Sequence, residues 1–288
     1  MNRSLSGLLP GRSSQPGKRV LPGFALSLGV SLFFISIVLL LPLTGLIMQT
    51  ADMGWERYWA VVTDERVIAS YKVTLWAAAL ASIINGLVGL LLAWVLVRYD
   101  FPGKRIMDAL IDLPFALPTA VAGITLTALF ATDGWYGQIF SLFDIKVAFT
   151  PLGIIVAMSF TSLPFVVRTV QPVLEDLAPE DEEAAVSLGA TDWTVFRRIL
   201  FPAMWPALMT GVALSFTRSL GEFGAVIFIA GNMPYVSEII SLMIFVRLQE
   251  FDHAAASAIA SVVLIASLIL LLGINLWQAR YLRRLHGR

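Results

Sequence analysis

The chain has 288 residues, of which 58% are hydrophobic and only 14% are charged, with a formal net charge of zero and no cysteine. A soluble domain of this size carries roughly 25% charged residues, so the composition predicts an all-α polytopic membrane protein. The absence of cysteine excludes disulfides and thiolate metal sites, and the balanced charge argues against a nucleic-acid partner. His253 and His286, far apart in sequence, leave little material for a zinc site or for histidine-based catalysis.

The first residues predict a tail followed by a membrane span. Residues 1–22 are polar and rich in Ser, Gly and Pro, which is typical of a disordered cytosolic tail. Gly17-Lys18 ends a near miss for a phosphate-binding loop, because the spacing is one residue too long and Arg19 replaces the required Ser or Thr. We therefore expect no ATP binding by this chain. The apolar stretch 23–48 exceeds the roughly 7–15 residues of a signal-peptide core and lacks a cleavage site, so it predicts a retained span.

Five further apolar segments are long enough to cross a membrane. They cover about 69–97, 108–131, 150–173, 202–230 and 254–277. Residues 236–250 are apolar but too short to cross, which predicts a re-entrant or interfacial helix. The basic residues concentrate in the N-terminus, in loops 98–107 and 168–201, and in the basic tail 281–288, which places these segments in the cytosol. The result is six transmembrane helices with both termini inside, and a seventh crossing at 236–250 would put the basic tail outside.

Two of these spans carry features that bear on packing. Small residues fall four apart on one face of 69–97: Ala81, Asn85, Gly89 and Ala93. This spacing predicts close helix packing, with Asn85 hydrogen-bonded across the interface, rather than a transport site. Pro114 and Pro118 predict a kink in 108–131. The sequence leaves open whether this kink lines a pathway or only disturbs packing.

The cytosolic loop 174–201 predicts two short helices joined at a glycine. Pro179 suits the first helical position, and the acidic residues that follow it complement the helix dipole. Gly189 is expected to end this helix with a positive φ. Thr191 or Asp192 is then expected to cap a second helix.

The second of these helices has one apolar face, because Trp193, Phe196 and Leu200 recur at offsets of three and four. Pro202 is expected to mark the start of the next element. The order Glu-Ala-Ala, three residues, Gly, nine residues, Ile, two residues and Pro resembles the EAA loop of bacterial ABC-importer permeases. The matching positions are Glu183, Ala184, Ala185, Gly189, Ile199 and Pro202.

The resemblance implies a type I ABC importer permease fold and a contact with a separate protein. In that family the EAA loop is a coupling helix that docks into a groove on an ATPase subunit. The implied contact comprises the matching residues together with Leu188 and Phe196. The alternative is an ordinary helical hairpin between two membrane spans.

Two charged residues, Arg218 and Glu222, lie four apart inside the predicted span 202–230. A charged side chain at the centre of a bilayer costs at least about 2.5–3.5 kcal/mol, so such residues indicate function. One interpretation is an intrahelical ion pair that neutralises itself. The other is that Arg218 faces a pathway and offers its charge to an anion, and that Gly221 and Gly224 allow close contact with another helix at a gate. The sequence leaves both open.

This region extends the resemblance to a branch of the family. Ser219-Leu-Gly-Glu-Phe-Gly224, followed by Gly231-Asn232, resembles the sulfate and molybdate branch of ABC permeases, which implies that Ser219 and Asn232 also belong to the pathway or gate. Residues 235–252 are more similar to the T-type permease subunit of bacterial sulfate/thiosulfate importers. His253 stands where an aromatic residue is expected. The likeness covers most of the chain, from about 23 to 277.

The resemblance also implies partners and a location. A W-type second permease completes the channel, two copies of a cytosolic ATPase carry ATP and Mg, and a periplasmic binding protein delivers sulfate or thiosulfate. This chain is then a multi-pass protein of the bacterial inner membrane, in contact with the lipid bilayer, with no cofactor and no catalytic residue of its own. The alternatives are a molybdate or tungstate permease and an ion-coupled secondary transporter. The latter needs mid-membrane carboxylates, of which Glu222 is the only strong example, and an internal repeat, which is not clear here.

Overall fold

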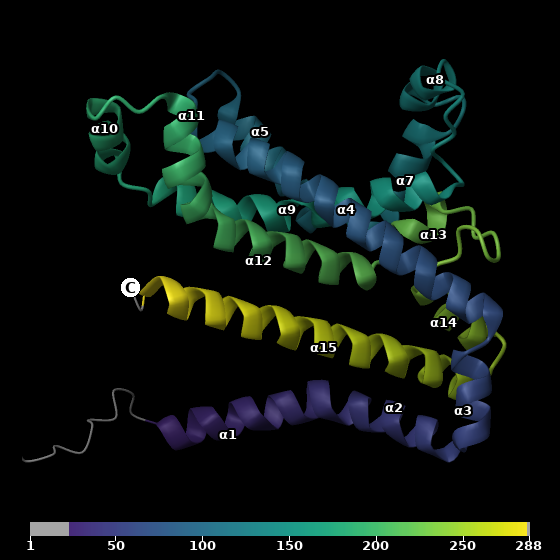
Figure 1. Ribbon diagram of the computed structural model, residues 1–288. Helices are drawn as coiled ribbons and strands as arrows, with labels where there is room; N and C mark the ends of the chain where they lie inside the picture. The colour runs from purple at the N-terminus through teal and green to yellow at the C-terminus, as the bar shows by residue number, and fades with distance from the viewer. Residues whose placement is uncertain (1–22, 287–288) are drawn as a thin grey trace, which may run out of the picture. The chain divides into compact units, whose positions relative to one another are not determined.

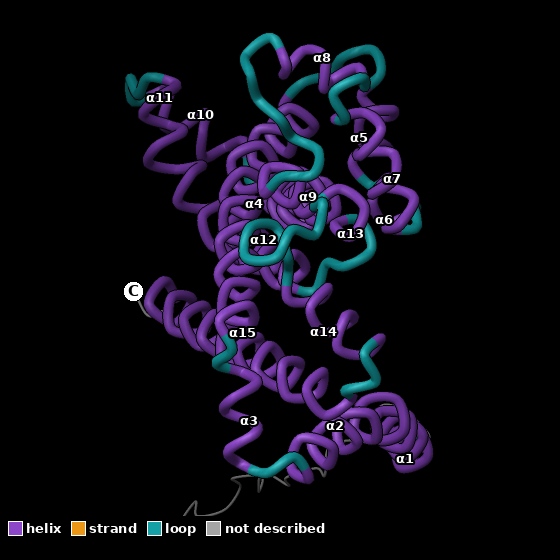
Figure 2. Tube along the Cα trace, turned by 90° about the vertical axis from the view of Figure 1, so that its right-hand side faces the viewer, coloured by secondary structure: helices purple, strands orange, loops and turns teal. Residues whose placement is uncertain are grey.

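The computed structural model describes the backbone of residues 23–286 and the side chains of residues 23–274 and 276. The expected tail 1–22 lies outside the described residues. Within them every regular element is a helix, as the sequence predicts for an all-α protein (Figure 2). The chain divides into two compact units, residues 1–48 and 49–288, which are described separately.

The described residues of the first unit form a single apolar helical stretch. It comprises α1 (Phe24–Ile35), a five-residue π-helical segment (Ser36–Leu40) and α2 (Leu41–Asp52), whose last residues belong to the second unit. None of these residues is buried by the chain. An apolar surface of this length suits lipid, and it extends to Asp52 rather than ending at residue 48 as predicted.

Three long helices form the centre of the second unit: α4 (Glu65–Arg98), α9 (Pro151–Glu175) and α12 (Phe201–Leu220), which lie against one another (Figure 1). They approach each other closely at Val166 of α9. A Cβ added at Gly89 of α4, or at Gly211 of α12, would come within 2.8 Å of this valine. The predicted packing face of α4 is confirmed, because all four of its small residues are buried.

The predicted third span, 108–131, is not one helix. It is divided into α5 (Lys104–Ile111), α6 (Leu113–Ala116) and α7 (Thr119–Phe130). Leu117 is extended, with φ −84° and ψ 136°, because the ring of Pro118 disfavours the α conformation in the residue before it. Pro114 thus lies in the first turn of α6 and Pro118 separates α6 from α7, so the segment is broken and not merely kinked.

The predicted fifth span, 202–230, is wrong at both ends. The helix begins with α11 (Asp192–Val195), continues through a π-helical segment (Phe196–Leu200) into α12, and ends at Leu220. Pro202 therefore lies inside a continuous helix and does not start one. A proline cannot donate the i→i−4 hydrogen bond, and the π-helical segment directly before it absorbs this loss. A short α13 (Val226–Ile229) follows the end of α12.

The remaining helices of the second unit are α3 (Trp55–Val62), α8 (Trp135–Ser141), α10 (Pro179–Ser187), α14 (Ile240–Gln249) and α15 (His253–His286). The predicted short helix exists as α14, and its place in the membrane stays a prediction. α15 runs past residue 280, where the basic tail is expected to begin.

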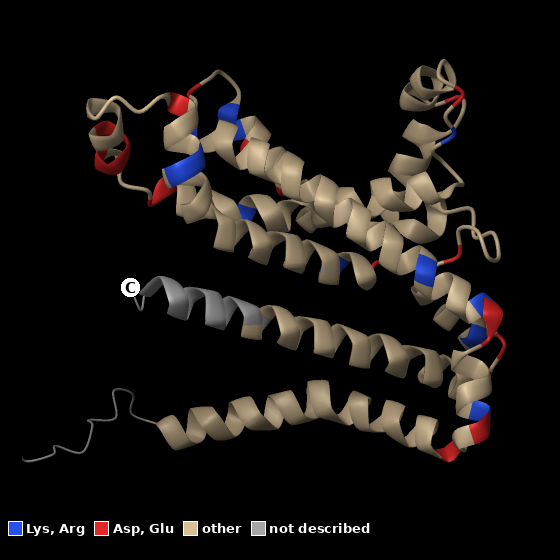
Figure 3. Ribbon diagram, viewed as in Figure 1, with Lys and Arg blue, Asp and Glu red and all other residues tan. Residues whose placement is uncertain are grey.

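Five helical stretches of the described chain are long and apolar enough to cross a membrane, and α7 and α14 are shorter apolar helices. The count of six spans and the side on which the termini lie stay predictions. In the second unit, charged residues gather near the two ends of the long helices, around α10 and α11 at one end and around α3 and α14 at the other (Figure 3). The end with α10 and α11 is called the loop end below.

Candidate functional site

The predicted turn between the two short loop helices is confirmed. α10 ends at Ser187, and Gly189 has a φ of +82°. The amide of Ala190 donates to the carbonyl of Ala185 at 3.0 Å, and the amide of Gly189 donates to Val186 at 2.9 Å. These two bonds form the Schellman arrangement, in which a left-handed glycine closes the end of a helix.

The sequence offers two candidates for the N-cap of the second loop helix, Thr191 and Asp192, and the structure has the first. Thr191 is its cap, and its hydroxyl accepts a bond of 3.4 Å from the amide of Thr194. Asp192 is instead the first helical residue. The loop is therefore a hydrogen-bonded turn between two capped helix ends.

The surface of α10 is almost entirely free. Glu183 and Ala184 are exposed, and Leu188 just beyond the helix is 89% exposed, which is unusual for a large apolar side chain. Ala185 differs from its neighbour, because it packs against the apolar cluster at the loop end. The face available to a partner therefore includes Ala184 and Leu188, while Ala185 supports the loop from inside.

The second half of the motif turns inward. Phe196 contacts the rings of Trp94, Trp193 and Phe201 at centroid distances of 5.5, 5.6 and 5.9 Å. Ile199 is partly buried in the same cluster. Pro202 is exposed within the continuous helix. The motif thus combines an exposed part in α10 with an aromatic anchor on α4.

Arg218 and Glu222 form the ion pair that one interpretation of the sequence expects. Nη1 of Arg218 lies 2.7 Å from Oε2 of Glu222, and the Glu222 side chain is 1% exposed against 32% for Arg218. Oε1 of Glu222 accepts a 3.0 Å bond from the amide of Ala225. The carboxylate is therefore fixed inside the protein, whereas part of the guanidinium remains accessible. Pairing and partial access to an anion coexist in this geometry.

This ion pair lies where α12 ends, near the middle of the bundle. Nδ2 of Asn85 on α4 donates to Oγ of Ser215 on α12 at 3.1 Å. Asn85 lies about 30 Å from the Glu65 end of α4 and about 20 Å from its Arg98 end at 1.5 Å per residue, and Arg218 is one turn closer to the Glu65 end. An ionisable residue near the middle of a membrane-spanning bundle indicates a functional site.

The other predicted pathway residues have different surroundings. Ser219 is fully buried, and its hydroxyl lies 3.1 Å from that of Ser162. Gly224 packs tightly, since an added Cβ would collide with Thr119, whereas Gly221 is exposed. Asn232 lies in the loop after α13 with φ +51°, and its amide donates to Ile227. The described contacts do not join Asn232 to Arg218.

A buried polar cluster joins the three central helices beside the ion pair. The amide of Asn85 donates to Oγ of Ser162 at 2.9 Å and to the carbonyl of Ser159 at 3.1 Å, as well as to Ser215. Ser215 in turn bonds Ser162 at 3.0 Å. Asn85 thus joins helices, as its spacing predicts.

Three arginines form ion pairs that the sequence did not predict. Arg168 of α9 pairs with Asp108 and Asp112 of α5, both at 2.6 Å, and so lies in a helix rather than in the loop 168–201. Arg66 makes two bonds to the buried Glu238, at 2.7 and 2.8 Å. Arg98 pairs with Glu182 at 2.6 Å. The rule that drew attention to Arg218, a charge in an apolar run, would also have found Arg168 and Glu238.

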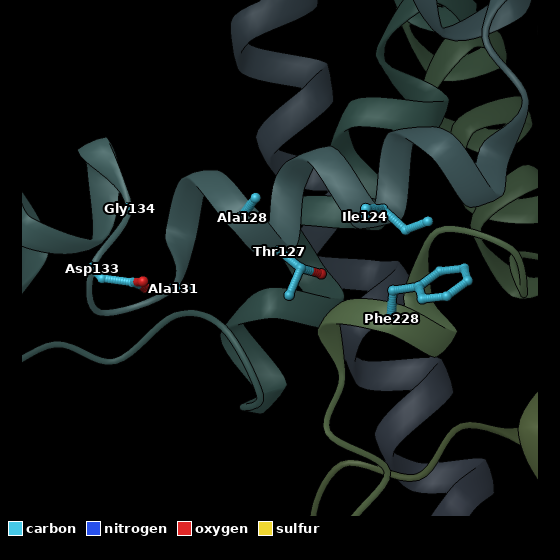
Figure 4. A pocket seen from close by; sticks show the side chains of 7 residues that line it. All are labelled: Ile124, Thr127, Ala128, Ala131, Asp133, Gly134 and Phe228. Carbon is cyan, nitrogen blue, oxygen red and sulfur yellow. The ribbon is translucent and has the colours of Figure 1, made fainter.

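A pocket of about 440 Å³ lies beside α7, the loop that follows it and Phe228 (Figure 4). Its polar groups are Thr127, whose hydroxyl is bonded to the Gly123 carbonyl, and the carboxylate of Asp133. One negative charge and no cation line this pocket. Its chemistry does not suit an oxyanion, so Arg218 remains the better candidate for that role.

Residues 85–287 match the family described as binding-protein-dependent transport system inner membrane component. The chain belongs to this family. It is 65% identical to the sulfate transport system permease protein CysT of Salmonella typhimurium over 270 residues, which is 94% of this chain and 98% of that protein. The protein of the same name from Escherichia coli is 64% identical over the same shares. That of a Synechocystis species is 48% identical over 88% of this chain and 89% of its own length.

Solved structures agree on the fold. A bacterial ABC transporter that imports the acidic polysaccharide alginate matches with a TM-score of 0.75 at 18% identity, covering 90% of this chain and 96% of that one. An inward-facing methionine ABC transporter matches with a TM-score of 0.56 at 13% identity, covering 76% and 99%. The fold is that of a type I ABC importer permease.

Membership of this family defines the general setting of the chain. It is a multi-pass permease of the inner membrane, and such a permease works with a partner permease, an ATPase and a binding protein. The family is one of transport permeases rather than of catalytic subunits. The loop end and the Arg218 pair are therefore candidate sites for transport, not for bond-breaking chemistry.

Proposed function

We propose that this chain is a permease subunit of an ATP-driven importer of sulfate, with thiosulfate as a second substrate. The observation that carries the proposal is the 65% identity to a sulfate permease over 94% of the chain. A W-type second permease completes the pathway, a periplasmic binding protein delivers the oxyanion, and ATP and Mg bind to a separate cytosolic ATPase. This chain binds no cofactor of its own.

The proposed ATPase contact is the exposed part of the loop. Leu188 is a large apolar side chain with almost no cover, Ala184 lies one turn before it and is exposed, and Glu183 is exposed as well. Isolated apolar exposure is ordinary, but here it sits on an ordered turn that the Schellman bonds hold in place. This combination supports docking into a groove of a partner.

The proposed substrate contact is the accessible side of Arg218. Glu222 neutralises the guanidinium when no anion is present, and the buried position of that carboxylate keeps it in reach. An oxyanion that passes the end of α12 then finds a partly screened positive charge near the middle of the bundle. A planar guanidinium suits two oxygens of a tetrahedral anion better than an ammonium does.

The decisive experiment is reconstitution of the chain in proteoliposomes with the ATPase, the partner permease and the binding protein. ATP hydrolysis and uptake are measured with sulfate, thiosulfate, molybdate and tungstate in turn. We expect sulfate and thiosulfate to stimulate both. Stimulation by molybdate or tungstate alone assigns the chain to the other oxyanion branch, and uptake driven by an ion gradient without ATP contradicts the proposal altogether.

A further inference from the structure

α10 touches the rest of the chain through very few side chains. Of its nine residues, Pro179–Ser187, only Glu182 and Ala185 are partly buried, and the others are exposed. They are three residues apart and therefore lie on the same face. Ala185 supplies a small apolar contact with the loop-end cluster, so Glu182 is the one polar side chain that holds this helix against the bundle.

The partner of Glu182 is unusually well placed. Nη2 of Arg98 donates to Oε1 of Glu182 at 2.6 Å, and the guanidinium lies 5.3 Å from the centroid of the Trp94 ring. The Arg98 and Glu182 side chains are 26% and 23% exposed. Arg98 is also the last residue of α4, where a cation complements the helix dipole. These three residues are called the Arg98 contact.

The same tryptophan holds the second half of the loop. The Trp94 ring meets Phe196 edge to face, and Phe196 stacks on Trp193. Both halves of the loop therefore contact the last turn of α4. α10 does so through the ion pair with Arg98, and the second half does so through aromatic rings against Trp94.

α4 packs against the loop and differs from the two helices that are joined to it in the chain, α9 before it and the helix through α12 after it. α4 is one α-helix from Glu65 to Arg98 with no internal proline, whereas α9 contains Pro164 and Pro172 and the helix through α12 is interrupted by five π-helical residues at 196–200. α4 also carries Asn85, which bonds Ser215 one turn before Arg218. A displacement at Arg98 is thus passed along an unbroken helix to the neighbourhood of the proposed substrate contact.

We propose that α4 is the element that carries movement of the ATPase to the substrate pathway, and that the Arg98 contact connects it to α10. This inference rests on the proposed function, because it needs an ATPase bound at the loop. Arg98 and Glu182 are positioning residues in this scheme. Their loss leaves the ATPase attached through the exposed face of α10 but separates hydrolysis from transport.

The test uses the reconstituted importer and measures sulfate taken up per ATP hydrolysed, together with the amount of ATPase that co-purifies. Glu182→Gln, Arg98→Gln and the exchanged pair Arg98→Glu/Glu182→Arg are compared with wild type. The loss of one partly exposed ion pair is expected to lower the uptake-to-hydrolysis ratio by about two- to fivefold in each single variant. The exchanged pair regains part of the ratio, though not the contact of a cation with Trp94. ATPase co-purification stays at the wild-type level.

Asp176→Arg is the matched control, since Asp176 is exposed, lies in the same cytosolic segment and undergoes the same change of charge as Glu182→Arg. Its ratio is expected to remain that of wild type. Glu182→Gln changes only a partly exposed side chain on a surface helix, so it keeps the test available if the Arg98 variants do not fold.

Each other outcome has a distinct meaning. An unchanged ratio in Glu182→Gln overturns the inference, as does an equal fall in the Asp176→Arg control. Loss of the ATPase from the single variants also overturns it, because Glu182 is then a docking residue. If wild type itself shows no sulfate-stimulated hydrolysis, the proposed function fails rather than the role of α4.

Discussion

Replacing Gly189 isolates the contribution of backbone conformation to docking of the ATPase. The residue has φ +82°, and a Cβ added there meets no atom within 4 Å. A substitution at this position therefore introduces no collision, and its cost is that of placing a side chain in the left-handed region. That cost is about 1–2 kcal/mol for an ordinary residue, is lower for asparagine and is highest for a β-branched one.

These energies translate into affinity if the turn must hold its shape for the loop to dock. A penalty of 1.4 kcal/mol corresponds to a factor of ten, so Gly189→Ala is expected to weaken ATPase binding by about 5- to 30-fold. Gly189→Asn weakens it less and Gly189→Val more. The measurement is the dissociation constant of the ATPase for the permease pair in nanodiscs, alongside the thermal unfolding midpoint of each variant.

Gly103 provides a matched control. It has φ +92° and equally open surroundings, but it caps α5 outside the EAA loop. Gly103→Val imposes the same local strain and is expected to leave ATPase affinity unchanged. The reasoning is refuted if Gly189→Val binds the ATPase as wild type does, if the order Asn, Ala, Val is not observed, or if the Gly103 variant loses affinity equally.

Three further outcomes are expected. Arg218→Ala should lose more sulfate uptake than Arg218→Lys, because lysine keeps the positive charge. Equal losses in the two variants point to the fork geometry of the guanidinium. Recovery of uptake in Arg218→Ala/Glu222→Ala assigns the ion pair to neutralisation alone. Gly89→Ala places a Cβ 2.8 Å from Val166 and should lower the free energy of unfolding by about 1–3 kcal/mol. The measurement is the thermal unfolding midpoint, which should fall in Gly89→Ala and partly recover when Val166→Ala is added. An unchanged midpoint contradicts the close packing. Leu188→Asp should reduce ATPase co-purification without changing the unfolding midpoint, and full retention removes Leu188 from the contact.

Local chemistry was enough to predict the loop. Proline at the start of α10, acidic residues after it, a glycine at its end and a threonine before α11 each act through their own backbone or nearest neighbours. The packing face of α4 was predictable for the same reason, because small residues at a spacing of four lie on one side of any helix. Such features hold wherever the helix is placed.

The broken spans were harder to predict, because an apolar segment has the same hydropathy whether its helix is continuous or interrupted. Residues 108–131 and 202–230 are apolar throughout most of their length, yet prolines divide the first and the second ends at Leu220. A proline inside a span does not by itself decide the outcome, since Pro164 and Pro172 lie within the continuous α9. Whether a helix breaks depends on the neighbours that satisfy the freed backbone groups, and these come from elsewhere in the chain.

The sequence by itself determined the membrane class, the EAA loop with its turn at Gly189, and the presence of two charged residues, Arg218 and Glu222, in an apolar segment. Only the tertiary structure decided what those residues touch. Glu182 and Arg98 are 84 positions apart, and Arg66 and Glu238 are 172 apart, so no periodicity connects them. Periodic patterns indicate which residues share a face of a helix. The pairing of charges depends instead on which helices pack together and on how they are aligned along their axes. In this chain the central helices meet at Val166 and Asn85, which are contacts that only the tertiary structure shows.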